Sequence, residues 1–311
     1  MAKARLSGDE ERSLAIRAAW LHYVGGLRQA EVAKRLGVPS VKAHRLIARA
    51  VAEGAVKVTI EGEIIECIEL GEAICARYGL RTCEVAPDLE EDGLPLRTLG
   101  LAGASLLRRW LEGGEAMTIG VSHGRTLAEA VHSMPRIETK GIKFVSLFGG
   151  LTRNFAANPH DVMHLLAEKT GAPAYVMPVP FFANTAEDRE VLLSQRGVAE
   201  IIEMGENAPL KFVGLGTVKP ETQLVTSGMI EPAEIKAIDR AGGVGEMLGH
   251  FFDRNGQIVE TALSPRTLSV SMDKASDQNI IALAGGPGKI EAIRAILRSG
   301  KLSGLVTDER T

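Results

Sequence analysis

A short apolar strand, a glycine-bearing loop and a helix follow one another repeatedly through most of this 311-residue sequence. The pattern is clearest at 117–121 before SHGRT, at 142–148 before GG, in KFVGLG at 211–216, and at 280–284 before GGPGK. Strands that alternate with helices predict an α/β fold, in which a mostly parallel sheet is covered by helices on both faces. The glycine loops then follow the carboxyl ends of the strands, where open α/β sheets bind ligands.

These glycine loops hold the first candidate ligand-binding residues. Glycine lets backbone N–H groups approach an anion or a sugar closely. Arg125 and Thr126 lie where the helix after the first loop begins, and a helix N-terminus favours a phosphate or hydroxyl group. Lys289 starts a later helix, but GGPGKI lacks the G-x-x-x-x-G-K-S/T pattern of a nucleoside-triphosphate site. A tight turn without a ligand explains any one loop, whereas four loops at one sheet edge favour a pocket.

Residues 29–53, QAEVAKRLGVPSVKAHRLIARAVAE, predict a separate pair of helices joined by a tight turn. Gly37 ends the first helix, as a glycine after the last periodic residue often does. The second helix is expected to bury one apolar stripe, formed by Val41, Leu46, Ile47 and Ala50. Such a pair is typical of a helix-turn-helix, whose second helix enters the major groove of DNA. The alternative is an ordinary helical hairpin with a solvated basic face.

The polar face of the second helix and the first residue of the first helix are predicted to contact DNA. These candidates are Gln29, Ser40, Lys42, His44, Arg45 and Arg49. The run VKVTIEGEIIECIEL at 56–70 alternates apolar and polar residues. This alternation predicts two strands that turn at Glu61-Gly62, which makes the head a winged helix-turn-helix.

The charge distribution agrees with a DNA-binding head. Residues 1–60 contain eleven Lys or Arg and five Asp or Glu, a net charge of +6. Because the whole chain has a formal net charge of −3, residues 61–311 have a net charge of −9. A basic segment on an acidic body indicates a polyanion-binding module joined to a second unit. We therefore predict two domains, a winged helix-turn-helix DNA-binding domain at 1–60 and an effector-binding domain at 61–311.

The sequence gives no sign of a membrane span or a metal site. No run of eighteen apolar residues occurs and the first residues lack the apolar region of a signal peptide, so we expect a cytoplasmic protein without a membrane partner. Cys67, Cys75 and Cys83 form no Cys-x-x-Cys pair and are expected to be buried free thiols. His160 and His164 are four apart on a predicted helix, but zinc would need a third ligand, so we expect no metal and no cofactor.

Taken together, the motifs resemble those of the SorC family of sugar-responsive transcriptional regulators. AEVAKRLGVPSVKAHRLIARAVAEGAVKV stands where that family has its helix-turn-helix, and GVSHGRTL, FVSLFGG, GLGT, GGVGEMLGHFFDRNG and LAGGPGKIEAIRAILRSGKLSGLVTDE follow in family order. The resemblance implies a phosphosugar isomerase-like α/β domain that binds a sugar, polyol or sugar phosphate and alters DNA binding. It also implies an oligomer, with a homotetramer as the common form. Within the family, the sequence is similar to regulators of erythritol catabolism.

The resemblance further implies which residues surround the effector. With the loop glycines, they are Gly124, Arg125, Thr126, Gly149, Gly150, Asn158, Glu246, Gly286 and Lys289. Two positions depart from the family pattern. His123 replaces an aromatic residue common in GVGWG-like versions, which leaves the identity of the effector open. Phe148 precedes Gly149 where phosphate-binding relatives can carry a basic residue, which weakens the case for a bisphosphate effector.

We therefore expect a DNA-binding transcriptional repressor of a carbohydrate or polyol catabolic operon, gated by a sugar, polyol or sugar phosphate, with operator DNA as its partner and no catalytic residue. The alternative is an isomerase- or deaminase-like enzyme that carries a DNA-binding head. Such chemistry needs an acid and a base within hydrogen-bond reach of the substrate. Glu246 and His123 are the candidates for these two roles.

Overall fold

The computed structural model describes residues 8–56, 64–153, 156, 158–272 and 279–311. The chain divides into two compact units, residues 1–62 and residues 63–311. None of the helices in these described stretches combines the length and the apolar character that a membrane-crossing segment requires.

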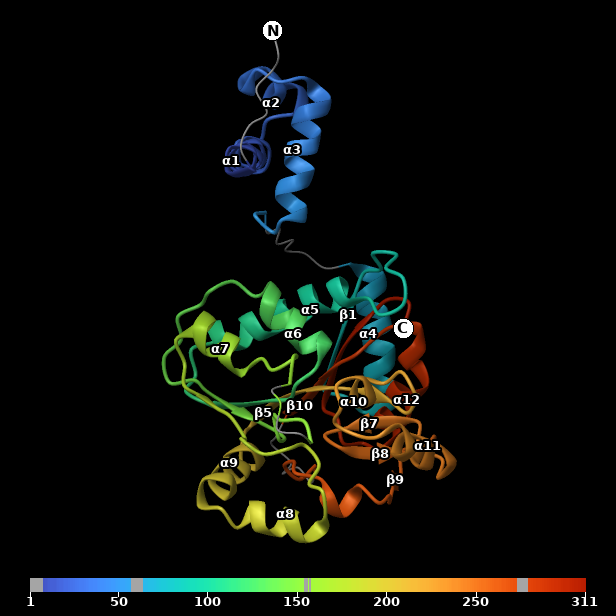
Figure 1. Ribbon diagram of the computed structural model, residues 1–311. Helices are drawn as coiled ribbons and strands as arrows, with labels where there is room; N and C mark the ends of the chain where they lie inside the picture. Colours follow the sequence, from blue (N-terminus) through green and yellow to red (C-terminus); the bar gives the residue numbers. More distant parts are fainter. Residues whose placement is uncertain (1–7, 57–63, 154–155, 157, 273–278) are drawn as a thin grey trace. The chain divides into compact units, whose positions relative to one another are not determined.

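The first unit is helical. It contains α1 (Gly8–Ala19), the π-helical segment η1 (Trp20–Val24), α2 (Gln29–Leu36) and α3 (Ser40–Ala52), as Figure 1 shows. Gly37 takes a φ of 64°, and its N–H donates to the carbonyls of Ala33 and Lys34, which closes the end of α2. The helices pack through mostly small apolar residues, namely Ala15, Ala18, Val32, Ala33, Ala43, Leu46, Ile47 and Ala50. The predicted helix pair and its glycine turn are confirmed.

The predicted buried stripe of α3 is wrong at one position. Val41 is 74% exposed, and Ala43 takes its place beside Leu46, Ile47 and Ala50. Positions 43, 46, 47 and 50 follow the i, i+3, i+4, i+7 spacing of one helix face. Because each residue turns the helix by about 100°, Val41 lies roughly 200° away from Ala43 and therefore on the opposite face.

The second strand of the predicted wing is also wrong, because helix α4 spans Ile65–Tyr78. The first strand and the turn lie outside the described residues. The reason for the helix is packing within the second unit. A Cβ at Gly71 would come 2.5 Å from the carbonyl oxygen of Cys83, which belongs to strand β1 (Thr82–Ala86) of the second unit. Helix α4 therefore lies directly against β1. This long-range contact overrides the local alternation of apolar and polar residues.

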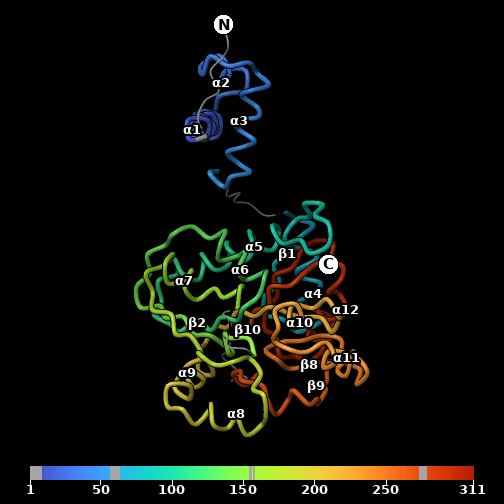
Figure 2. The backbone as a smooth tube through the Cα atoms, viewed as in Figure 1, coloured from blue at the N-terminus to red at the C-terminus, as the bar shows by residue number. Residues whose placement is uncertain are grey.

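The described residues of the second unit form a seven-stranded parallel sheet in the order β1-β11-β10-β5-β2-β3-β4. Its strands are β1 (Thr82–Ala86), β2 (Thr118–Val121), β3 (Lys143–Ser146), β4 (Ala174–Tyr175), β5 (Leu210–Gly214), β10 (Asn279–Leu283) and β11 (Gly304–Asp308). Strands β1 and β11, which are first and last along the chain, are parallel neighbours at one edge of the sheet (Figure 2). The predicted α/β class with a mostly parallel sheet is confirmed.

Helices cover both faces of this sheet. The described helices of this unit are α4, α5 (Leu96–Glu112), α6 (Arg125–Ser133), α7 (Met163–Thr170), α8 (Ala186–Leu193), α9 (Arg196–Glu206), α10 (Gln223–Thr226), α11 (Pro232–Arg240) and α12 (Ile290–Arg298), with short 3-10 turns η2 (Ser264–Arg266) and η3 (Pro287–Lys289). Side chains alternate along each strand. Ile281 and Leu283 of β10 therefore pack in the core shared with α5, α6 and α7, whereas Ile280 and Ala282 pack in the core shared with α12.

A second, antiparallel sheet extends from the end of β5. It consists of β6 (Gly216–Thr217), β7 (Gly245–Met247), β8 (His250–Phe252) and β9 (Ile258–Val259). The segment FFDRNGQIV forms a hairpin between β8 and β9, in whose turn Asp253 Oδ1 accepts the N–H groups of Asn255 at 2.9 Å and Gln257 at 2.8 Å. Since β7 pairs with β6, Glu246 is carried to the carboxyl end of the parallel sheet.

All three cysteines are free thiols. Cys67 is buried, but Cys75 and Cys83 are partly exposed, which corrects the expectation that all three are buried. Burial raises the pKa of Cys83 to about 12, so this side chain remains a protonated thiol at neutral pH.

Candidate functional site

A cavity of about 130 Å³ lies at the carboxyl ends of β2, β3, β5 and β10. Its wall includes residues that follow each of these four strands, which is where an open α/β sheet binds ligands. Six of the nine predicted effector-binding residues line it, namely Gly124, Arg125, Thr126, Asn158, Glu246 and Lys289. A cavity of about 150 Å³ holds a molecule the size of benzene, so this one suits a small ligand.

The loop after β2 forms one wall of the cavity. Gly124 has a φ of 145° and immediately precedes α6, so the first N–H groups of that helix have no partner inside it. Thr126 is buried in this turn, whereas Arg125 is exposed at the rim. Ser122 Oγ accepts the N–H of Gly214 at 3.0 Å, which fastens this loop to the end of β5. A helix start in this setting favours an anionic or hydroxyl group.

Three basic side chains meet at this end of the cavity. Lys289 is half-buried, and its Nζ donates to the Leu215 carbonyl oxygen at 2.6 Å. Burial and then the positive charge of Arg125 lower the pKa of Lys289 to about 8, although Glu246 opposes the shift. Burial and Arg125 likewise lower the pKa of His160. Arg125 and Lys289 therefore form a positive cluster that an anionic ligand group would neutralise, whereas the lowered pKa of His160 favours its uncharged form.

Glu246 is the buried acidic group of the same cavity. Burial raises its pKa to about 7, although the Gly249 N–H, which it accepts at 2.7 Å, and the Lys289 charge lower it. Gly216 faces it across the β6–β7 pair, where a Cβ would come 2.4 Å from Glu246 Oε2. Gly216, the second glycine of GLGT, is therefore needed because any side chain there would collide with the Glu246 carboxyl group. Near neutral pH, Glu246 can both donate and accept a hydrogen bond.

Replacing Glu246 with glutamine is expected to change how stability depends on pH. The folded state raises the pKa of Glu246 from 4.5 to about 7, so its contribution to stability is fully present below pH 4.5 and is lost as the pH rises through about 7. Glutamine keeps an acceptor for the Gly249 N–H but does not titrate. Urea unfolding of both proteins on either side of this range should show a smaller loss of stability with rising pH in Glu246→Gln. Identical pH slopes would contradict the shifted carboxyl group.

His123 is one of the residues around the cavity, and its side chain is fully buried. Its Nε2 is 3.0 Å from Ser146 Oγ, and Ser146 Oγ itself donates to the Phe148 carbonyl oxygen at 2.7 Å. The His123 ring meets Phe148 edge to face, with centroids 4.9 Å apart. Burial lowers the pKa of His123, although Asp161 opposes the shift, so the ring is neutral at pH 7.

Three predicted residues do not line the cavity. A Cβ at Gly149 would lie 2.2 Å from the Pro180 carbonyl oxygen, so this glycine permits contact between two chain segments. A Cβ at Gly150 would lie 3.4 Å from Asp161 Oδ2 and 3.7 Å from His123 Nε2. Gly286 donates its N–H to Asp308 Oδ2 at 3.0 Å and to Thr311 Oγ1 at 2.7 Å, so that N–H is already occupied by the protein. These glycines support the site through packing.

Several cavity residues had no assigned role at the level of sequence. Phe148 and Phe181 stack with their ring centroids 4.0 Å apart and form an apolar wall of the cavity. The segment 221–224 and Met229 close another side. Neither carries a local motif. His160 also lines the cavity, but it precedes α7 and so does not share a helix with His164. Among the described residues, no three His, Cys, Asp or Glu side chains are arranged to hold a metal ion.

The predicted DNA-binding residues lie along α2 and α3 of the first unit. Gln29 is the first residue of α2, and Ser40, His44 and Arg45 are exposed on α3 together with the half-buried Lys42. Arg49 differs from the others. Its guanidinium forms ion pairs with Glu53 at 2.6 Å and Glu11 at 2.9 Å, which join the end of α3 to α1. Arg49 thus has two partners within the protein, and its predicted contact with DNA stays a prediction.

Comparison with known proteins agrees with this architecture. Residues 62–311 match the family described as "Putative sugar-binding domain". The sequence is 64% identical to the erythritol catabolism regulatory protein EryD of Brucella abortus (strain 2308) over 303 residues, which cover 97% of this chain and 96% of that protein. It is 27% identical to the deoxyribonucleoside regulator of Bacillus subtilis (strain 168), over 97% of this chain and 96% of that protein. The fold is similar to the full-length sorbitol operon regulator SorC from Klebsiella pneumoniae, with a TM-score of 0.69, 24% identity and 97% of both chains covered.

These relatives are named as regulators, and they give no support to the isomerase- or deaminase-like enzyme. The match at 62–311 covers the unit that holds the cavity. The 64% identity extends through both units of the chain. The chain therefore belongs to the SorC family of transcriptional regulators.

Proposed function

We propose that this protein is a cytoplasmic repressor of a polyol or carbohydrate catabolic operon, and that a small polyol or its phosphate in the cavity changes its affinity for operator DNA. The observation that carries this proposal is one small cavity that combines a positive cluster with buried hydroxyl-binding groups. The likeness to a regulator named for erythritol catabolism makes erythritol and its phosphate the first compounds to test.

The cavity chemistry supports this class of effector. Arg125 and Lys289 provide positive charge for a phosphate or another electron-rich group. Glu246 and Asn158 provide buried polar groups for hydroxyls, and the stacked Phe148–Phe181 wall suits the carbon face of a polyol. A volume of about 130 Å³ favours a ligand of few carbons over a disaccharide.

The effector proposal is tested by calorimetric titration with erythritol, erythritol 4-phosphate and the longer polyol sorbitol. A four-carbon compound should bind, and it should raise the midpoint of thermal unfolding because it binds only the folded state. Sorbitol should bind more weakly because the cavity is small. Fluorescence anisotropy with a duplex selected from a random DNA pool then measures whether the bound compound releases DNA. Failure of both four-carbon compounds to bind would contradict the proposal.

DNA recognition is proposed to depend on the exposed face of α3. Arg45→Ala is expected to reduce discrimination between the selected duplex and a scrambled one by about 1–3 kcal/mol, because an arginine that contacts a base edge carries sequence information. Arg196→Ala is a matched control, since this arginine belongs to the second unit and its side chain is 92% exposed. Competition binding at one salt concentration measures both. Equal discrimination in the parent and in Arg45→Ala would show that Arg45 does not contact a base edge.

Self-association as a homotetramer is part of the proposal. Exposed apolar side chains occur in both units, including Trp20 and Val24 of η1 and Ile65 of α4, which are 60%, 69% and 69% exposed. Such side chains are candidate contacts for a subunit interface where they gather in one patch. Sedimentation velocity over a range of concentrations tests the assembly, and a protein that stays monomeric throughout would contradict it.

A further inference from the structure

A buried carboxylate outside the cavity holds the loop that carries Lys289. Asp308, the last residue of β11, is 2% exposed and is not one of the residues that line the cavity. Its Oδ2 atom accepts the Gly286 N–H at 3.0 Å and the Thr311 hydroxyl at 2.6 Å, and its Oδ1 atom accepts the Thr311 N–H at 3.0 Å. The Thr311 hydroxyl oxygen in turn accepts the Gly286 N–H at 2.7 Å. The start of the loop is therefore fixed by a charge-assisted network.

The loop has little room to take another position. A Cβ at Gly285 would lie 2.1 Å from Asp308 Oδ2, and a Cβ at Gly286 would lie 2.9 Å from the Gly93 carbonyl oxygen. Gly286 also has a φ of 95°, a backbone conformation that residues with side chains rarely adopt. Its carbonyl oxygen accepts the Lys289 N–H at 3.0 Å, which closes the turn η3. Asp308 therefore fixes the backbone from which the Lys289 side chain extends.

The influence of Asp308 on Lys289 passes through this backbone. Burial lowers the pKa of Lys289, and the nearby charges that act on it are those of Arg125 and Glu246. The tip of the Lys289 side chain donates to the Leu215 carbonyl oxygen at 2.6 Å in the cavity wall. The side chain is thus held at its backbone by the Asp308 network and at its ammonium group by Leu215.

We propose that Asp308 is a positioning residue for effector binding, because its carboxylate sets where the Lys289 ammonium group lies in the cavity and thereby sets the affinity for the electron-rich end of the effector. This inference rests on the proposed function, since Lys289 belongs to that cavity. A binding group contributes fully only when its neighbours hold it within about 0.5 Å of the productive position. The carboxylate suits this role because each of its oxygen atoms accepts a backbone N–H, whereas an amide has one acceptor oxygen.

Asp308→Asn tests this role with nearly the same side-chain volume. The amide NH2 group that replaces one carboxylate oxygen faces the N–H of Gly286 or Thr311 and cannot accept from it. Thr311→Val is a milder second variant, because it removes the hydroxyl group and leaves the carboxylate. Asp253→Asn is the matched control, since the Asp253 carboxylate also accepts backbone N–H groups but belongs to the hairpin between β8 and β9, outside the cavity wall. Thermal unfolding shows whether each variant is folded.

Calorimetry with erythritol 4-phosphate gives the first measurement. Asp308→Asn should weaken its binding roughly tenfold, Thr311→Val should weaken it less, and Asp253→Asn should leave it unchanged. The Asp308→Asn change made in Lys289→Ala should have no further effect, because the group that Asp308 positions is already gone. A loss of similar size with and without Lys289 would show that Asp308 supports the fold in general, and the inference would be overturned.

The carbon-13 chemical shift of the Lys289 ε-carbon, titrated with pH, gives a second measurement that needs no ligand. In the parent the midpoint should lie at about 8, because burial and Arg125 lower the pKa of Lys289 to that value. A loosened loop exposes the ammonium group to water, so Asp308→Asn should raise the midpoint toward 10.5, the ordinary pKa of lysine. Asp253→Asn should keep the parent's midpoint, and Lys289→Ala identifies the signal.

The two measurements separate this inference from the proposed function. An unchanged Lys289 midpoint in Asp308→Asn overturns the inference, and the proposed function then depends on calorimetry with the parent alone. If neither erythritol nor erythritol 4-phosphate binds the parent, the proposed function fails, and the Lys289 titration still decides whether Asp308 positions this side chain.

Discussion

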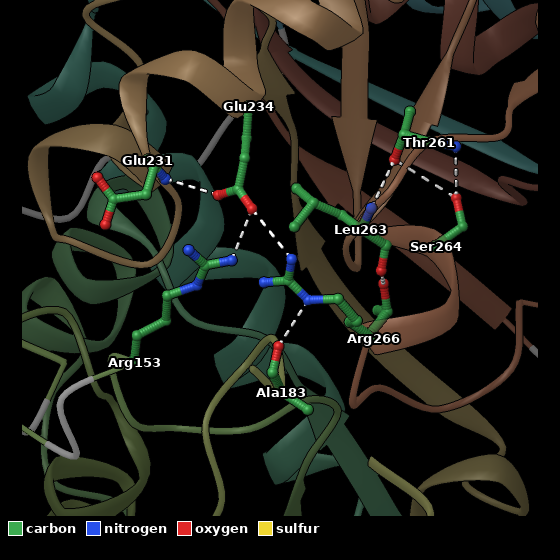
Figure 3. A network of polar contacts seen from close by, with 9 residues as sticks. Arg153, Ala183, Glu231, Glu234, Thr261, Leu263, Ser264 and Arg266 are labelled. Atoms are coloured by element: carbon green, nitrogen blue, oxygen red, sulfur yellow. Dashed lines mark hydrogen bonds and ion pairs between the residues drawn. The ribbon is translucent and has the colours of Figure 1, made fainter. Parts of the chain in front are cut away.

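Replacing Glu234 with alanine is expected to lower the free energy of unfolding of the second unit by about 3 kcal/mol. Glu234 Oε1 accepts hydrogen bonds from the guanidinium groups of Arg153 at 2.7 Å and Arg266 at 3.2 Å, as Figure 3 shows. The three side chains are only 15–19% exposed. Without the carboxylate, two positive charges remain close together and largely out of water. Removing one partner from a buried ion group is therefore far more costly than breaking a surface pair.

Urea unfolding followed by circular dichroism measures this loss, and the midpoint of thermal unfolding should fall by roughly 6–12 °C. Glu200→Ala is the matched control, because Glu200 pairs with Arg196 on an open helix surface where the two side chains are 61% and 92% exposed. Its expected cost is below about 0.5 kcal/mol. Equal losses in the two variants would show that burial of the Glu234 group contributes nothing.

The Glu234 group also holds one wall of the cavity. Arg266 Nε donates to the Ala183 carbonyl oxygen at 2.7 Å, and the Leu268 N–H donates to the Phe181 carbonyl oxygen at 2.9 Å. Phe181 lines the cavity two residues before Ala183. Loss of the carboxylate should therefore loosen this wall and weaken effector binding in addition to lowering stability.

The local sequence pattern predicted helices and strands correctly in segments where tertiary packing favours the same secondary structure as the pattern. The strand–glycine–helix units gave the parallel sheet because buried strands and short turns leave a clear local signal. The pattern was misleading where packing with distant segments decides. Val41 looks like a core residue because it is apolar, yet the geometry of α3 places it on the exposed face. Residues 65–70 alternate like a strand, yet contact with β1 makes them helical.

The candidate site shows the same division. Arg125, Thr126 and Lys289 were identified because a helix start after a glycine loop is visible in a single sequence. Gly149 and Gly286 carry the same local signal, but they serve contacts with Pro180 and Asp308, which lie far away along the chain. The segment 221–224 reaches the cavity only through the tertiary fold. No spacing rule predicts such a contact, because it depends on how separate loops meet at the sheet edge.

Replacing Lys289 with alanine is expected to weaken effector binding roughly ten- to a hundredfold and to leave operator affinity unchanged when no effector is present. Lys289 lies in the cavity wall, and the predicted DNA contacts belong to a separate unit with its own core. Lys219→Ala is the matched control, because Lys219 is exposed and lies outside the cavity wall while its Nζ contacts the neighbouring Gly288 carbonyl oxygen at 3.4 Å. DNA titrations at several effector concentrations compare the parent and the two variants.

The pH dependence of effector affinity provides a second test of Lys289. Since burial and Arg125 lower the pKa of Lys289 to about 8, the ammonium group loses its proton as the pH rises through that value. Affinity for erythritol 4-phosphate should then fall above about pH 8 in the parent and in Lys219→Ala, and fall much less in Lys289→Ala. Coupling between two ligands is reciprocal, so operator DNA must change effector affinity by the same factor as effector changes operator affinity. If Lys289→Ala responds to effector at the parent's concentration, Lys289 does not bind the effector. If it loses DNA binding without effector, its bond to Leu215 supports the fold instead.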